Sequence, residues 1–265
     1  MSGGLETDGA ETGGAETEGM GIGGPADFLL GGRVRLLQPE DGYRAAIDPV
    51  FLAAVTAARP GERVLDVGTG TGAAALCLAA RVPEAAVVGL EQRADAAGFA
   101  RRNAALNGLE SRVAIVEGDL LAPPEALRPG SFDRVMMNPP YLRADAASRP
   151  PDAWKAAANV EGAARLPDWL RFADAMLKPR GTVTLVHRAD RLDDILEALR
   201  PRFGALAVVP LWPKAGQEAR RVLVAARKGL RSPARLTAGV VIHEADGRYT
   251  AAAERILRDA AALEL

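Results

Sequence analysis

The chain has 265 residues, of which 48% are hydrophobic, and a formal net charge of −1 at pH 7. This length allows one or two domains with a sizeable core. Its one cysteine, Cys77, excludes a disulfide framework and favours a reducing, cytoplasmic setting. No apolar run is long enough to span a membrane, and no basic segment followed by an apolar core marks a signal peptide, so we expect no membrane partner.

The first 27 residues differ in composition from the rest of the chain. They contain six acidic residues and no lysine or arginine, and glycine, glutamate, threonine and alanine dominate them. Such a segment cannot bury enough apolar surface to offset its ordering entropy. We therefore predict a disordered acidic tail at 1–27 and a single domain at 28–265. Without the six negative charges the remainder carries +5, which permits a nucleic-acid partner and equally fits an ordinary mixed surface.

From residue 28 onward, apolar runs predict alternating strands and helices. A helix begins within 45–52, another spans 71–81, a third spans 95–106 before the helix-ending pair Asn107-Gly108, and a long one ends near Leu177. Strands are expected at 63–67, 86–90, 113–117, 134–137, 182–186, 205–211 and 221–226. Prolines 210 and 213 suggest that the strand at 205–211 lies near an edge. This alternation predicts an α/β fold with a doubly wound, mainly parallel, seven-stranded sheet of Rossmann-like type.

A glycine-rich loop, Val-Leu-Asp-Val-Gly-Thr-Gly-Thr-Gly at 64–72, joins the first of these strands to the next helix. Glycines allow a tight turn and let a ligand approach the backbone, beside the positive end of the helix. Glu91 follows the second strand, where a carboxylate can accept hydrogen bonds from both hydroxyls of a ribose. The combination predicts a nucleotide-type ligand.

Two cofactors fit this loop. Gly68, Gly70 and Ala73 satisfy the dinucleotide pattern, so an NAD-dependent dehydrogenase remains an alternative. Gly72 adds the tighter form with three alternating glycines, and Asp66 is suited to the cationic end of S-adenosylmethionine, directly or through water. We favour S-adenosylmethionine, and a test is which cofactor raises the melting temperature.

The tetrapeptide Asn138-Pro139-Pro140-Tyr141 follows the fourth strand. In a doubly wound sheet the first and fourth strands flank the point where ligands bind, so the tetrapeptide is expected beside the cofactor loop. The Asn138 side-chain carbonyl and a backbone carbonyl at Asn138–Pro139 can accept hydrogen bonds from the two N–H groups of an amine. These bonds would orient the nitrogen lone pair and stabilise the positive charge that develops on the nitrogen. The prolines stiffen the turn, and Tyr141 can stack on a flat substrate. We predict an N-methyltransferase; the alternative is a proline turn with Tyr141 packed in the core.

Other chemistries lack their residues. A cytosine-C5 methyltransferase needs a cysteine near the fourth strand, whereas Cys77 lies on the helix after the glycine-rich loop and is expected in the core. No histidine and cysteine cluster has metal-ligand spacing, so no metal is expected. His187 and His243 are each isolated in the sequence and are more readily structural or exposed than catalytic.

These motifs resemble class I S-adenosylmethionine-dependent methyltransferases that act on amino groups. The resemblance rests on the glycine-rich loop, Glu91, Gly118-Asp119-Leu120 after the third strand, and the tetrapeptide, and it covers the chain from about Leu30 to the end. A more specific similarity is to the bacterial family that methylates N6 of the adenine following the anticodon in a valine tRNA. The segments that carry it are 36–39, 47–54, 211–213, 220–224 and 243–250.

The resemblance implies roles for individual residues. The methionine part of the cofactor would lie among Asp66, Gly68, Thr69, Gly70 and Gly72, with Thr69 where such loops often carry Cys or Ser. Glu91, followed by Gln92, would hold the ribose, and Asp119 with Leu120 would meet the adenine ring. Asp48 would close over the cofactor, and Asn138 would border the cofactor as well as the target amine. That amine would be held by Asn138, Pro139, Pro140 and Tyr141.

An RNA partner, a tRNA in the first place, would need cations around the site. Seven lie within 214–235 (Lys214, Arg220, Arg221, Arg227, Lys228, Arg231 and Arg235), while Arg33, Arg35 and Arg44 precede the site and Arg143 and Arg149 follow Tyr141. They could track phosphates or form a solvated face.

The substrate has alternatives, because relatives with the same tetrapeptide methylate other groups. A protein glutamine N5-methyltransferase shares the chemistry but usually carries a sizeable helical recognition domain, for which residues 28–65 leave little room. A DNA adenine enzyme would need a base-reading domain that does not fit in the chain. A non-catalytic scaffold that binds S-adenosylmethionine or RNA is a further class. The oligomeric state, monomer or homodimer, stays open.

Overall fold

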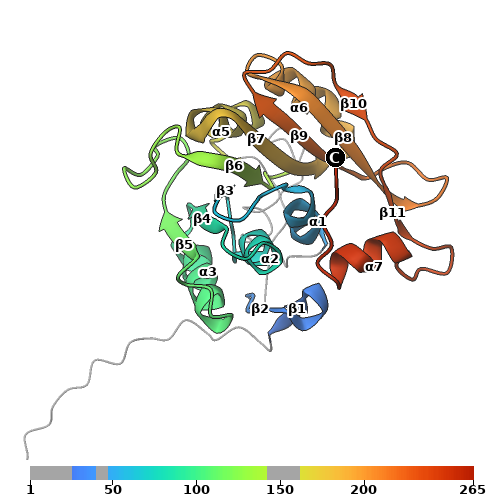
Figure 1. The fold of residues 1–265 in the computed structure, drawn as a ribbon, viewed down its shortest axis with the longest axis horizontal. Coiled ribbons are helices and arrows are strands. Elements are labelled where there is room, and N and C mark those ends of the chain that lie inside the picture. Colours follow the sequence, from blue (N-terminus) through green and yellow to red (C-terminus); the bar gives the residue numbers. More distant parts are fainter. Residues whose placement is uncertain (1–25, 40–46, 142–161) are drawn as a thin grey trace, which may run out of the picture.

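A computed structural model describes residues 26–39, 47–141 and 162–265 (Figure 1). The tail at 1–25 lies outside the described residues, as do Arg44, Arg143 and Arg149, and the first strand begins at Asp27. The strands are β1 (Asp27–Leu29), β2 (Val34–Leu36), β3 (Arg63–Val67), β4 (Ala86–Glu91), β5 (Val113–Glu117), β6 (Phe132–Met137), β7 (Leu177–Arg188), β8 (Phe203–Lys214), β9 (Arg221–Lys228), β10 (Arg235–Leu236) and β11 (Val240–His243). No helix among these residues is long and apolar enough to cross a membrane.

The main sheet runs in the order β10-β8-β9-β7-β6-β3-β4-β5, and β11 also pairs with β8. Strands β5, β4, β3, β6 and β7 pair in parallel, whereas β9 is antiparallel to both of its neighbours. The prediction of a doubly wound, mainly parallel sheet is confirmed. The seven predicted strands are all present, and the two short strands β10 and β11 are added beside β8. Pro210 lies on β8 between the stretches that pair with β10 and β11, where a missing N–H costs no ladder bond.

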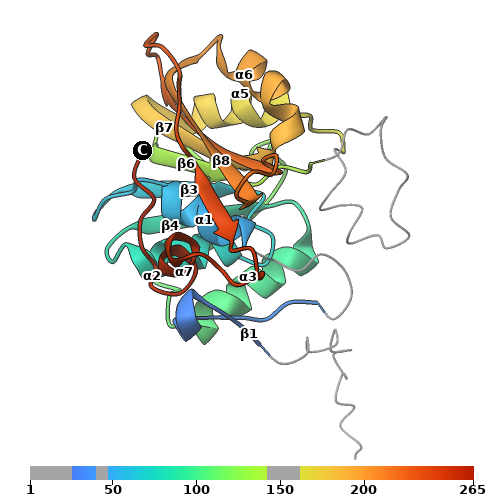
Figure 2. The same ribbon diagram turned by 90° about the vertical axis from the view of Figure 1, so that its right-hand side faces the viewer.

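Two layers of helices cover the sheet. Figures 1 and 2 show α5 (Leu166–Met176) and α6 (Leu192–Leu199) on one side, and α1 (Asp48–Val55), α2 (Ala73–Arg81), α3 (Ala94–Leu106) and α7 (Ala251–Leu257) on the other. Each layer of helices packs on one face of the sheet and forms a hydrophobic core with it. On β3, Val64 packs in the core on the side of α1 and α2, whereas Leu65 and Val67 pack in the core on the side of α5 and α6. Because the central strands are buried on both faces, their sequences are almost continuously apolar. Cys77 is buried in the core, as predicted.

An N-terminal hairpin of β1 and β2 precedes the domain core and was not predicted. Asn103, a fully buried residue of α3, fastens it to the glycine-rich loop. Its side-chain NH2 group donates to the backbone oxygens of Leu37 and Thr71, both at 2.9 Å, and its Oδ1 accepts from the Leu37 N–H at 2.7 Å. A buried amide with its donors and acceptor all paired is a rigid anchor, so the hairpin supports the loop from outside the sheet.

The pairing of β3 with β6 decides where the functional residues lie. Val67 and Met137, the last residues of these two parallel strands, are partners in the sheet. The chain therefore leaves the sheet at Gly68 and at Asn138 side by side. This is the reversal point of the strand order, where a doubly wound sheet leaves a crevice for a ligand.

Candidate active site

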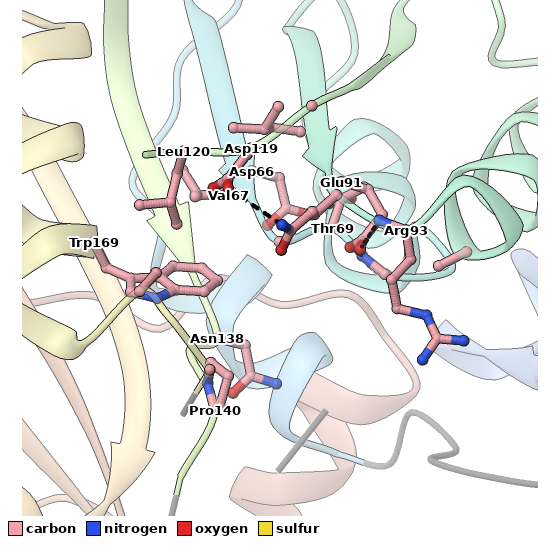
Figure 3. A pocket seen from close by; sticks show the side chains of 18 of the residues that line it. Asp66, Val67, Thr69, Glu91, Arg93, Asp119, Leu120, Asn138, Pro140 and Trp169 are labelled. Carbon is pink, nitrogen blue, oxygen red and sulfur yellow. Dashed lines mark hydrogen bonds between the residues drawn. The ribbon is translucent and has the colours of Figure 1, made fainter. Parts of the chain in front are cut away.

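A cavity of about 370 Å³ opens at the carboxyl ends of β3, β4, β5 and β6 (Figure 3). Figure 3 shows Asn138 and Pro140 at one end, Glu91 and Arg93 at the other, and Trp169 along one side. Most of the predicted site residues line this one cavity: Asp66, Gly68, Thr69, Gly70, Glu91, Gln92, Asp119, Leu120, Asn138, Pro140 and Tyr141. Asp48, Gly72 and Pro139 are not part of its lining.

The three glycines of the loop all have positive φ, but they are needed for different reasons. At Gly70 (φ +58) a Cβ would point into open space. At Gly68 (φ +68) a Cβ would lie 2.6 Å from Cη2 of Trp169. Gly72 (φ +89) caps the start of α2, where a Cβ would lie 3.4 Å from that of Ala100. The role of Gly72 is therefore to turn the chain into the helix, whereas Gly68 and Gly70 shape the cavity itself.

Glu91, the last residue of β4, clamps this loop. Its Oε2 accepts from the Gly70 N–H at 2.8 Å and its Oε1 from the Arg93 N–H at 3.0 Å. Burial raises the pKa of Glu91, and the backbone donors oppose that rise. Each carboxylate oxygen retains a lone pair, so Glu91 can accept two further hydrogen bonds from the cavity side.

Asp66 is the most perturbed carboxyl group of the site. It is 2% exposed, and burial raises its pKa from 3.8 to about 7, with a further contribution from the nearby Glu91 carboxylate. A hydrogen bond from Thr69 Oγ1 to Asp66 Oδ2, 2.6 Å long, opposes the rise. Asp66 therefore changes between acid and carboxylate near neutral pH, and Thr69 supplies the hydroxyl that holds it.

The raised pKa of Asp66 makes the free energy of unfolding depend on pH. A carboxyl group whose folded-state pKa exceeds its unfolded value favours the folded state in acid, and that contribution is lost as the pH rises toward about 7. Between pH 5 and pH 8, without cofactor, we expect wild-type unfolding free energy to fall by roughly 2–3 kcal/mol relative to Asp66→Asn, which keeps the bond from Thr69. Urea denaturation across this pH range measures it; parallel curves for the two proteins would contradict it.

The far wall of the cavity follows β4 and β5. Gln92 Nε2 donates to Asp119 Oδ2 at 3.2 Å, and the Leu121 N–H donates to Asp119 Oδ1 at 2.9 Å. These bonds hold Asp119 between a side chain and the backbone, with the apolar side chain of Leu120 beside it in the cavity wall. The result is an apolar wall with one fixed carboxylate, which suits a flat heteroaromatic ring that carries an amino group.

At the other end, Tyr141 joins the tetrapeptide to the rest of the molecule. Its hydroxyl lies 2.6 Å from Asn138 Oδ1 and 2.7 Å from Asp48 Oδ2, so its single hydrogen can be donated to either oxygen. Arg221 Nε donates to the same Asp48 oxygen at 3.1 Å, and the Arg221 guanidinium covers the Tyr141 ring at 4.5 Å from the centroid. Here Asp48 holds Tyr141 and Arg221 and does not line the cavity, which differs from its expected place over the cofactor.

His187 stands behind Tyr141, with the two rings edge to face at 5.4 Å between centroids. Burial lowers the pKa of His187 to about 4, and the neighbouring Arg191 cation contributes to the same effect. The imidazole is therefore neutral at physiological pH. This environment agrees with the structural role expected for His187, since a neutral buried ring packs against Tyr141 without adding charge to the site.

Comparison with known proteins identifies the architecture. Residues 47–210 match the model of the methyltransferase small domain family. A tRNA1(Val) (adenine(37)-N6)-methyltransferase from Aeromonas hydrophila is 32% identical over 209 residues, covering 78% of this chain and 85% of that protein. The chain belongs to the methyltransferase small domain family. The resemblance to class I S-adenosylmethionine-dependent methyltransferases is thereby confirmed, and the protein is an enzyme of that class.

Two other relatives of this methyltransferase carry different names. A crystal structure of a predicted O-methyltransferase from Agrobacterium tumefaciens matches with a TM-score of 0.70 and 29% identity, covering 82% of this chain and 99% of that one. A release factor glutamine methyltransferase from Deinococcus radiodurans is 50% identical, but over 91 residues only, which are 34% of this chain and 31% of that protein. The second similarity is thus confined to part of the domain.

S-adenosylmethionine, the cofactor of this methyltransferase class, fits the cavity. The loop at Gly70 leaves open space where any side chain would intrude, and Ala73 and Ala74, the first two residues of α2, line the same cavity. Glu91 offers two acceptor oxygens for a diol, and Asp66 sits where a carboxylate can face a cation. The dehydrogenase alternative is not supported by the family.

Among the residues of the cavity wall that the sequence did not predict, Trp169 and Arg93 have the largest side chains. Trp169 comes from α5, on the opposite face of the sheet from α2, the helix that follows the glycine-rich loop. Arg93 lies two residues after Glu91, and its guanidinium donates to the Asp95 carboxylate at 2.6 and 3.1 Å. Arg93 could have been found from its place two residues after Glu91. Trp169 had no signal, because it lies 28 positions after Tyr141 and belongs to no motif.

The basic cluster at 214–235 does not form one surface around the cavity. Lys214 and Arg221 lie at the end of the sheet where the cavity opens, but β9 runs away from it and Lys228 pairs with Phe203 at the opposite end. A strand of that length spans roughly 23 Å. Of the two alternatives for this cluster, tracking of RNA around the pocket therefore does not extend to Arg227 and Lys228 at the far end of β9, and Arg235 lies beside Ala207, partway along β8.

Proposed function

We propose that this methyltransferase transfers the methyl group of S-adenosylmethionine to the N6 amine of an adenine in RNA, with a tRNA in the cytoplasm as the favoured substrate. The single observation that carries the proposal is the position of Asn138, which lines the same cavity as Gly68, Gly70 and Glu91. The similarity to a tRNA adenine-N6 methyltransferase over 85% of that protein's length supports the choice of substrate.

The chemistry of an aromatic amine explains the tetrapeptide. The nitrogen lone pair is delocalised into the ring, so the nucleophile is weak until its N–H bonds are gripped and its geometry changes. S-adenosylmethionine supplies an electrophilic methyl group on a sulfonium. Asn138 Oδ1 accepts a hydrogen bond from one N–H group of the amine, and a backbone oxygen of the Asn138–Pro139 region accepts one from the other. The two bonds direct the nitrogen lone pair toward the methyl group and stabilise the positive charge that develops on the nitrogen.

Cofactor placement is part of the proposal. Glu91 would accept the ribose hydroxyls, and Asp119, held by Gln92, would face the adenine amino group beside Leu120. The methionine part would lie along Gly68 and Gly70, with Asp66 toward its cationic end. Asp48 and Gly72 then act indirectly, the first through Tyr141 and the second by shaping the loop.

A methylated glutamine amide is the second candidate, and it is less well supported. The glutamine methyltransferase relative matches only about a third of this chain, whereas the tRNA enzyme matches 78% of it. A scaffold without activity is disfavoured because Asn138 and Tyr141 keep their mutual hydrogen bond within the cavity wall. We also propose that residues 28–265 act as one catalytic domain and that the acidic tail, which the sequence predicts at 1–27, ends before Asp27, where β1 begins.

The experiment is transfer of tritiated methyl from the cofactor to separated total tRNA, rRNA, DNA and protein, followed by nucleoside analysis of the labelled fraction. We expect label in tRNA, recovered as N6-methyladenosine. Label found only in protein would contradict this proposal and favour a protein glutamine methyltransferase. Label in another nucleoside would retain RNA but reject the N6 position.

A further inference from the structure

Trp169 carries a buried hydrogen-bond donor without a partner. The side chain lies in the first turn of α5, is 9% exposed and lines the cavity. Within residues 26–39, 47–141 and 162–265, no atom accepts a hydrogen bond from its Nε1. Since native proteins nearly always pair a buried N–H with protein, water or ligand, this donor points to a group that the cavity is built to receive.

The orientation of the indole narrows the possibilities. Its benzene edge rests against the glycine-rich loop, because Cη2 and Cζ3 are the atoms nearest to a Cβ built on Gly68, at 2.6 and 3.0 Å. Cζ2, on the N–H side of the ring, is farther away at 3.9 Å. The N–H therefore stands on the flank turned away from Gly68. Figure 3 shows the ring beside the cavity, with Leu120 on one side and Asn138 and Pro140 on the other.

An adenine presents a matching pair of groups. Its N6 amine donates, and the ring nitrogens next to it, N1 on one edge and N7 on the other, accept. A side chain that reads adenine in nucleic acids commonly offers one acceptor and one donor together, as the amide of Asn or Gln does. In this cavity Asn138 Oδ1 is the acceptor and Trp169 Nε1, which can only donate, is the donor.

We propose that Trp169 is a specificity-determining residue of the acceptor pocket, and that its indole N–H donates to the ring nitrogen beside the amine of the methyl-accepting adenine. The proposal rests on the proposed function and adds to it. Asn138 grips the amine, and Trp169 checks that an acceptor nitrogen lies next to that amine. The indole also forms a flat wall for the base, in a place where Gly68 leaves it room.

The test uses Trp169→Phe, which keeps an aromatic ring and removes the N–H. Trp212→Phe is the matched control, because Trp212 lies on β8 outside the cavity and its Nε1 already donates to the Ala238 carbonyl at 3.0 Å. We expect Trp169→Phe to lower kcat/KM for tRNA about tenfold, as for the loss of one hydrogen bond, with the Kd for S-adenosylmethionine unchanged by calorimetry. Trp212→Phe should change neither value.

Substituted RNA provides a second measurement that needs no variant to fold. Wild-type enzyme is assayed on a tRNA fragment whose target adenine is replaced by 1-deazaadenine or by 7-deazaadenine. One of the two should lose about tenfold in kcat/KM, and with that base Trp169→Phe should cost nothing further, since the bond is already absent. The analogue that is affected identifies the ring nitrogen.

Two outcomes would overturn the inference while leaving the proposed function intact. One is full activity of wild type on both deaza substrates. The other is a weakened Kd for S-adenosylmethionine in Trp169→Phe that accounts for its whole defect, which would assign the N–H to the cofactor. If the wild-type enzyme methylates no RNA at all, the proposed function itself fails.

Discussion

Asn138→Ala is expected to lower kcat for methyl transfer by about 10²–10³-fold, the usual cost of removing one preorganised group that stabilises transition-state charge. The Kd for S-adenosylmethionine should change by less than about twofold, because the loss is confined to an interaction that strengthens as the methyl group is transferred. Single-turnover kinetics with saturating tRNA measures the first quantity and calorimetry the second. An unchanged kcat would remove Asn138 from the mechanism.

Tyr141→Phe is the control that separates two roles: accepting the hydrogen bond from the target amine, which we assign to Asn138, and orienting the Asn138 side chain, which we assign to the Tyr141 hydroxyl. The variant keeps the ring under Arg221 and loses the hydroxyl that lies 2.6 Å from Asn138 Oδ1 and 2.7 Å from Asp48 Oδ2. The acceptor oxygen stays but is less well oriented, so the loss in kcat should be well below that of Asn138→Ala. Equal losses in the two variants would mean that the hydroxyl itself takes part in the reaction.

The placement of the tetrapeptide beside the glycine-rich loop could be predicted because it follows from local pattern and one topological rule. Short apolar runs bounded by glycines mark strands, and alternation with helices makes the sheet parallel. Once β3 and β6 are neighbours, Gly68 and Asn138 must emerge together. None of this requires knowing which side chains touch. The same logic places Glu91 and Asp119 at the same edge, since each follows or ends a parallel strand.

Contacts between distant segments were beyond the reach of the sequence. Arg221 was read as part of a basic cluster, yet it reaches Asp48 across 173 positions and covers Tyr141. Trp169 faces Gly68 from a helix on the other side of the sheet. Such pairs depend on how layers pack, and a single arginine or tryptophan in the sequence carries no mark of its partner.

The direction of β9 explains why the cations at 214–235 do not form one surface around the cavity. The cations at 214–235 are close in sequence, but residues on one extended strand separate by about 3.3 Å each, so Arg221 and Lys228 lie at opposite ends of β9. β7 was also predicted too short, because Lys178-Pro179-Arg180-Gly181 reads as a loop and Arg180 has a positive φ of 62° within the strand. Irregular strands that are held by their neighbours escape a reading based on local pattern.

Gly68→Ala is expected to destabilise the protein more than the same change at Gly70, the other glycine of the loop that lines the cavity. A non-glycine residue at φ +68° costs about 1–2 kcal/mol. The new Cβ would also lie 2.6 Å from Trp169 Cη2, and such overpacking costs about 1–3 kcal/mol more. Gly70→Ala is the matched control: its φ is +58° but nothing lies within 4 Å of the added carbon, so only the backbone cost should appear. Guanidinium denaturation measures both.

A double-mutant cycle with Trp169→Ala separates the clash from the backbone cost. With the indole removed, the free-energy cost of Gly68→Ala should fall by about 1–3 kcal/mol, while that of Gly70→Ala stays the same. Because both added carbons border the cavity, each alanine variant should also bind S-adenosylmethionine more weakly, Gly70→Ala through direct intrusion and Gly68→Ala through displacement of Trp169. If Gly68→Ala costs as much without the indole as with it, the loop and α5 are not packed against each other as described, and Trp169 loses its place in the acceptor pocket.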